Sequence, residues 1–101
     1  MKVRQSFQEK ALAQAEDNLY QAIAVLQTSL EVRKFFEDLC TPNERQALAD
    51  RWRVVELLKA GLSYRAIYEK TGVSVTTIGR VARCLLQKEG GYNLVYERLQ
   101  K

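Results

Sequence analysis

Hydroxyl side chains and arginines are concentrated between residues 63 and 83, in a chain that has no histidine. Ser and Thr hydroxyls donate to and accept from base edges and phosphates, and a guanidinium group is a strong donor to phosphate oxygens. These residue types indicate non-covalent binding of a nucleic acid duplex. The residues that we expect to contact DNA are Tyr64, Arg65, Ser74, Val75, Thr76, Thr77, Gly79, Arg80 and Arg83.

Residues suited to catalysis or metal binding are scarce. The two cysteines, Cys40 and Cys84, stand far apart with no histidine to act as a base, and no glycine-rich phosphate loop or paired acidic motif is present. A zinc site of four Cys or His ligands cannot be built from one such chain. We expect no enzymatic activity and no metal, and we interpret both cysteines as reduced packing residues.

The expected contact residues fall on the pattern of a helix-turn-helix over residues 63–83. Ser63 and Ser74 have N-cap side chains, so a helix is predicted to follow each of them, and Gly72 stands between them where a tight turn needs a positive φ. Apolar residues would lock the two helices at the angle that lets the second one enter a major groove. These residues are Ile67, Val73, Ile78 and Val81.

Some of these residues have a second interpretation. Arg65 can reach a phosphate or a base, or it can pair with Glu69 four residues further along the same helix. Tyr68 is either a ring that faces DNA or a packing residue. The side of the second helix that carries Thr76 and Arg80 is alternatively a solvated face without a ligand. The surrounding helix-turn-helix pattern favours DNA binding.

The rest of the chain predicts further helices, so we expect an all-α protein of about six helices in a single domain, residues 1–101. Thr28 and Glu31 have the spacing of a capping box, and Pro42 suits the first position of a helix that Gly61 would end. These signals and the apolar periodicity predict helices over residues 7–26, 29–38, 42–60 and 92–101.

The apolar positions of these helices predict what each one buries. We expect Phe35 and Phe36 to lie against another helix or chain, because so short a helix cannot cover both rings. The core stripe of the third helix would be Leu48, Trp52, Val55 and Leu58, and the last helix would bury Leu94, Val95 and Leu99.

The charge of the chain is unevenly distributed. The net charge is +4, but residues 1–40 hold five Lys and Arg against six Asp and Glu, while residues 41–101 hold eleven against six. The positive charge therefore belongs to the part with the helix-turn-helix, which is compatible with a polyanionic partner. Residues 1–40 we assign mainly to dimerisation. No signal-peptide-like apolar run is present, so we expect a cytoplasmic protein without a membrane partner.

From Leu39 to about Leu85 the sequence resembles the Trp repressor family, and particularly its YerC/YecD-type members. The resemblance covers roughly half of the chain and includes both the helix-turn-helix and a second capping box, in which Thr41 caps the helix that begins at Pro42 and Glu44 closes the box. It is carried by Thr41-Pro42, Glu44-Arg45, Ala47-Leu48, Arg51, Arg53, Val54-Val55-Glu56, Ser63, Arg65, Gly72, Thr77-Ile78 and Arg80.

The resemblance implies a Trp-repressor-like intertwined homodimer, in which the helices of residues 1–40 and the last helix of each chain wrap around the other. It also implies a site for L-tryptophan between Arg51 and Arg80, close to Thr41. Here, however, Val81 replaces a glycine that leaves room for the indole. Cys84 replaces a serine of the family pattern. We therefore expect no cofactor, with L-tryptophan as the alternative, and without it Arg51 would pair with a carboxylate or cap a helix.

These observations predict a sequence-specific, double-stranded DNA-binding transcriptional regulator, a repressor that acts as a homodimer on an operator. One alternative is a helical protein-interaction adaptor without specific DNA binding. Another is a helix-turn-helix protein like the promoter-reading region of sigma factors, since Gly61-Leu62-Ser63-Tyr64 followed by Ile67 fits that pattern too. Whether any small-molecule effector is sensed stays open.

Overall fold

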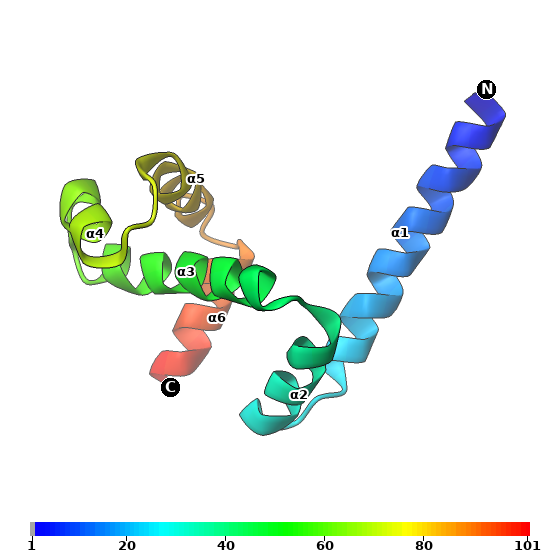
Figure 1. Ribbon diagram of the computed structural model, residues 1–101, viewed down its shortest axis with the longest axis horizontal. Helices are drawn as coiled ribbons and strands as arrows, with labels where there is room; N and C mark the ends of the chain where they lie inside the picture. The colour runs from blue at the N-terminus through cyan, green and yellow to red at the C-terminus, as the bar shows by residue number, and fades with distance from the viewer. Residues whose placement is uncertain (1) are drawn as a thin grey trace. The chain divides into compact units, whose positions relative to one another are not determined.

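The computed structural model describes the backbone of residues 2–101 and the side chains of residues 7–101. The described chain is all-α, as predicted, and none of its helices is long and apolar enough to cross a membrane. The chain divides into two compact units, and the boundary between them along the sequence is the Thr41–Pro42 bond. The helices are α1 (Lys2–Ala24), α2 (Ser29–Leu39), α3 (Pro42–Lys59), α4 (Tyr64–Thr71), α5 (Val75–Leu85) and α6 (Gly91–Gln100) (Figure 1).

The first unit consists of α1 and α2. Helix α1 begins at Lys2, earlier than predicted. The first residues of the chain are mostly polar, so the apolar periodicity gave no indication of a helix there. The predicted cap of α2 is confirmed: the Glu31 N–H donates to Thr28 Oγ1 at 3.1 Å, and the Gln27 N–H donates to Glu31 Oε1 at 2.8 Å. Phe35 and Phe36 lie edge to face, with ring centroids 6.2 Å apart, and both remain half-buried.

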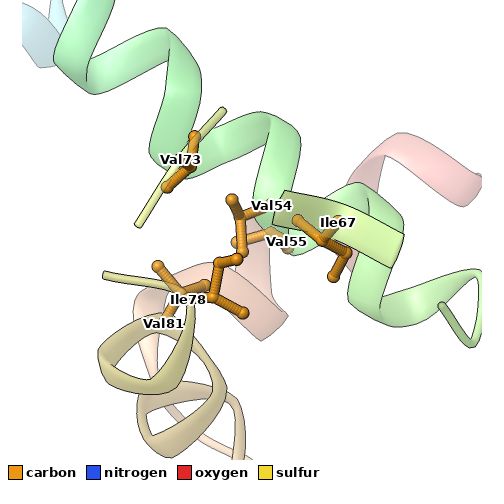
Figure 2. Packing of buried hydrophobic residues seen from close by; sticks show 6 residues of the cluster. All are labelled: Val54, Val55, Ile67, Val73, Ile78 and Val81. Carbon is orange, nitrogen blue, oxygen red and sulfur yellow. The ribbon is translucent and has the colours of Figure 1, made fainter. Parts of the chain in front are cut away.

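The second unit contains α3 to α6 and has an aliphatic core. Figure 2 shows the side chains of α3, α4 and α5 pointing toward one another around this core. Of the stripe predicted for α3, Val55 is buried, whereas Leu48 is exposed and Trp52 only half-buried. The core residues are Val54, Val55, Ile67, Val73, Ile78 and Val81.

Helix α6 packs on this unit with a different face from the one predicted. Leu94, Val95 and Leu99 were expected to be buried, but all three are exposed within the chain. Two aromatic residues cover the core instead. Tyr92 lies against Trp52 with ring centroids 6.3 Å apart, and Lys59 Nζ lies 5.3 Å from the centroid of the Tyr96 ring. An aromatic ring buries more area than an aliphatic side chain, which favours packing of this face within the chain.

Asn93 joins α6 to the end of α5. Its side chain is 95% buried, and Nδ2 donates to the Leu85 and Gln87 carbonyl oxygens, at 3.0 Å each. Leu85 is the last residue of α5, so its carbonyl group has no partner within the helix. The Gln87 carbonyl, just beyond the helix, also accepts from the Gly90 N–H at 2.9 Å. One amide group therefore satisfies the end of α5 and binds the turn before α6, which fixes the position of α6.

Replacing Asn93 by Ala should lower the free energy of unfolding by about 1–3 kcal/mol, since it removes two hydrogen bonds and leaves the Leu85 carbonyl at the end of α5 without its side-chain donor. Chemical denaturation followed by circular dichroism at one fixed protein concentration measures this change. Asn43→Ala, at an exposed position of α3, is the matched control and should change the value by less than about 0.5 kcal/mol. Equal effects of the two substitutions would show that the Asn93 hydrogen bonds contribute nothing to stability.

Candidate nucleic-acid interface

Helices α4 and α5 form the predicted helix-turn-helix, with the predicted residues at its ends. Ser63 Oγ accepts from the Ala66 N–H at 3.1 Å, and Ser74 Oγ accepts from the Thr77 N–H at 3.2 Å. Gly72 has φ of +75°, so the left-handed residue stands where the sequence indicated. The turn is held further by Thr71, whose hydroxyl donates to the Ile67 carbonyl at 2.7 Å and accepts from the Val73 N–H at 3.0 Å.

The core fixes the angle between the two helices. The four residues predicted to lock them, Ile67, Val73, Ile78 and Val81, are all buried in one cluster with α3 (Figure 2). Because one side of α5 is buried, the helical repeat defines its opposite side as the exposed one. This exposed stripe consists of Val75, Thr76, Gly79, Arg80 and Arg83, and only Gly79 among them is half-buried rather than exposed.

The predicted hydroxyl residues differ in what they do within the chain. Ser74 caps α5 and also donates from Oγ to Thr77 Oγ1 at 3.1 Å, so both hydroxyls hold the start of the helix. The hydroxyl of Thr76 is exposed and forms no hydrogen bond with any residue that the structure describes. Thr76 therefore has its full hydrogen-bonding capacity available to a ligand.

The arginines of α5 are also available. Arg80 and Arg83 are exposed and form no ion pair within residues 7–101, and α5 has no acidic residue. Arg65 pairs with Glu69 at 3.1 Å, as one of the two interpretations had it, but the side chains are 89% and 64% exposed. An exposed pair of this kind contributes only about 0.3–0.5 kcal/mol, so a phosphate can displace the carboxylate.

The tyrosines of α4 are not core residues. Tyr64 is 44% exposed and Tyr68 is 52% exposed. For Tyr68 this excludes packing into the core of its own unit. For Tyr64 the structure adds a neighbour that sequence reasoning missed, because its ring lies beside Gly79 of α5.

Gly79 stands in the middle of α5, where a glycine costs about 1 kcal/mol relative to Ala. A Cβ built on it would lie 3.7 Å from Arg83 Nη1 and 3.9 Å from Tyr64 Cε2, which are ordinary contact distances. Sequence periodicity places Arg83 one turn from Gly79, but only the packing of α4 on α5 brings Tyr64 to the same spot.

The residues assigned to L-tryptophan do not form a site that fits it. Arg51 is half-buried on α3 and Arg80 is exposed on α5, two helices that pack together. Val81 has no exposed surface, and its side chain fills the core next to the backbone where the indole would need room. The alternative for Arg51 is not seen either, since it forms no ion pair or hydrogen bond with the described residues.

Comparisons with known proteins agree on one family. The model of the Trp repressor protein family matches residues 14–100. The chain is 40% identical over 85 residues to the uncharacterized protein YerC of Bacillus subtilis (strain 168), and the match covers 84% of this chain and 82% of YerC.

Two solved structures have the same fold. A TrpR-like protein from Eubacterium eligens ATCC 27750 is 45% identical, with a TM-score of 0.75 over 86% of this chain and 90% of that one. A Trp-repressor-type protein from Staphylococcus aureus is 38% identical, with a TM-score of 0.79 over 91% of this chain and 92% of that one. The chain therefore belongs to the Trp repressor family.

Proposed function

We propose that this chain is a sequence-specific regulator of transcription that binds double-stranded DNA and represses by occupying an operator. The observation that carries the proposal is the placement of α5. Its buried side is anchored on α3 and α4, while its other side presents unpaired arginines and a free hydroxyl. A helix held in this way can lie in a major groove and contact base edges.

The exposed groups divide into two classes on this proposal. Arg80 and Arg83 neutralise phosphates, which gives affinity and a steep dependence on salt. Val75 and Thr76 face the bases, where an apolar group or a hydroxyl distinguishes one base pair from another. The segment Tyr64–Leu85 has four basic residues and one acidic residue, so the charge around these groups favours the duplex.

The partner that completes the protein is a second copy of this chain. Apolar side chains along α1 stay uncovered, with Phe7 69% and Leu12 67% exposed, and the Leu94, Val95 and Leu99 face of α6 is uncovered too. Helices with bare apolar stripes gain little stability on their own and bury these stripes against another helix. A two-fold dimer would place two copies of α5 about 34–36 Å apart, in successive major grooves of a pseudo-palindromic operator.

DNA binding does not require L-tryptophan on this proposal. The buried Val81 supports this, since the protein's own side chain occupies the volume next to the α5 backbone. A small molecule shifts an equilibrium only by binding one conformation better than another. With the core filled, α5 keeps its position against α3 without such a molecule.

Selection from a pool of random duplexes, run at fixed salt with and without L-tryptophan, tests the function directly. We expect one pseudo-palindromic site to be enriched to the same extent in both arms. Enrichment only with L-tryptophan would overturn the ligand-independent part of the proposal. Enrichment in neither arm would overturn specific DNA binding and favour a protein-interaction adaptor with the same fold.

Two substitutions on α5 should have different effects on the selected operator. Thr76→Ala should change the base preference at one position of each half-site, where a mismatch costs about 1–3 kcal/mol. Arg83→Ala should weaken binding about tenfold to every sequence and reduce the salt dependence by about one phosphate contact.

Fluorescence anisotropy on a panel of operator variants separates these two patterns. Lys34→Ala removes the same charge from an exposed position of α2 and serves as the control for Arg83→Ala. A uniform loss over the whole panel from Thr76→Ala would contradict its assignment to base contacts.

The dimer has its own test on α1. Leu12→Glu should dissociate it, because a carboxylate on the apolar stripe would have to be buried without a partner. Gln21→Glu introduces the same charge on the opposite side of α1, nine residues away, and should leave the dimer intact. Sedimentation velocity measures both variants at equal concentration. A Leu12→Glu protein that sediments like the Gln21→Glu protein would show that the stripe of α1 is not a subunit interface.

A further inference from the structure

Gly79 is a glycine that the fold itself does not need. Its φ lies outside the left-handed region, which among the described glycines only Gly61 and Gly72 occupy. A Cβ at Gly79 would meet its neighbours at ordinary van der Waals distances and would displace nothing. Because Ala is the better helix former, this helix is less stable than the backbone allows. The reason for the glycine is therefore not found in the backbone geometry or in the packing of the described residues.

The surroundings of Gly79 suggest what that reason is. On α5 it follows Val75 and Thr76 by one helical turn and precedes Arg83 by another, so it lies in the middle of the exposed stripe. The ring of Tyr64, itself 44% exposed, lies close to it. The guanidinium of Arg83, which has no partner among the described residues, is its other near neighbour.

A missing Cβ brings a ligand closer to the helix. Without it, a base pair can approach the α5 backbone by about the length of one carbon–carbon bond, roughly 1.5 Å. The carbon surface that it meets there consists of the Gly79 Cα and the edge of the Tyr64 ring, with the Arg83 guanidinium beside them. The one apolar group that a base pair presents in the major groove is the C5 methyl of thymine.

We propose that Gly79 is a specificity-determining position at which α5 accepts a thymine methyl group, packed between the Gly79 backbone and the Tyr64 ring. Arg83 lies next to this contact and binds the neighbouring phosphate. This inference rests on the proposed function, because it names the base feature that the same helix reads.

Gly79→Ala is the central test, since it should move stability and binding in opposite directions. The added methyl group raises helix propensity, so the Tm should rise by about 2–8 °C. The same methyl occupies the place of the thymine group, so affinity for the selected operator should fall about tenfold. A merely structural glycine would not give this combination.

Operators with deoxyuridine in place of each thymidine, one at a time, identify the contact. Removing the methyl group at one position of each half-site should weaken the wild-type protein about three- to fivefold. The same removal should leave the Gly79→Ala protein unchanged. Gly91→Ala is the matched control, because a Cβ there meets no described atom within 4 Å and the position lies at the start of α6, outside the helix-turn-helix.

The outcomes that contradict the proposal are distinct. A wild-type protein that selects no operator overturns the proposed function and this inference with it. A selected operator that Gly79→Ala binds as tightly as the wild-type protein overturns the role of Gly79 alone. A weakened Gly79→Ala protein, with no deoxyuridine position that affects the wild type, overturns the thymine assignment and indicates close approach to a phosphate.

Discussion

The burial of one side of α5 is the constraint on which the other features of the second unit depend. Ile78 and Val81 have no exposed surface and lie against aliphatic side chains of α3 and α4. Each such side chain contributes about 1.5–3 kcal/mol by leaving water, so a rotation of α5 about its axis would be costly. The core therefore determines which side of α5 faces outward. The polar residues on the outward side of α5 are not needed to hold the helix in place.

Helix α6 links this arrangement to the rest of the protein. Asn93 binds the end of α5 through two hydrogen bonds, while Leu94 and Leu99 of the same helix remain uncovered. If a second copy covers that face, as proposed, Asn93 connects the subunit contact on α6 to α5. It then helps to set the distance between the two copies of α5. A buried amide couples the positions of two helices, because its N–H groups lose their carbonyl acceptors when one helix shifts against the other. Dimerisation and DNA reading then share one set of contacts.

The sequence predicted the helix-turn-helix well because its signals are local. Ser63, Ser74 and Gly72 act within one helical turn of their own position, and the structure has all three in the expected roles. The face with which α6 packs inside its own chain was not predicted, since three aliphatic residues and two tyrosines are candidates for the same core and only tertiary packing decides between them. The contact of Tyr64 with Gly79 could not be predicted either, because it joins two helices across their crossing.

Two positions on α5 show how the stability of this helix is distributed. Val81 adds apolar contacts in the core at the position where the resembling repressors have glycine, and Gly79 gives up helix propensity on the exposed side. Val81 strengthens the attachment of α5 to α3 and α4. Gly79 leaves space for a ligand on the face of α5 that points away from those two helices. On the proposed function, a helix anchored by its own side chain needs no small molecule to hold its position. The exposed surface of α5 can then change without disturbing the core, and on the same proposal an alanine methyl group at Gly79 would occupy the space that a thymine methyl group takes.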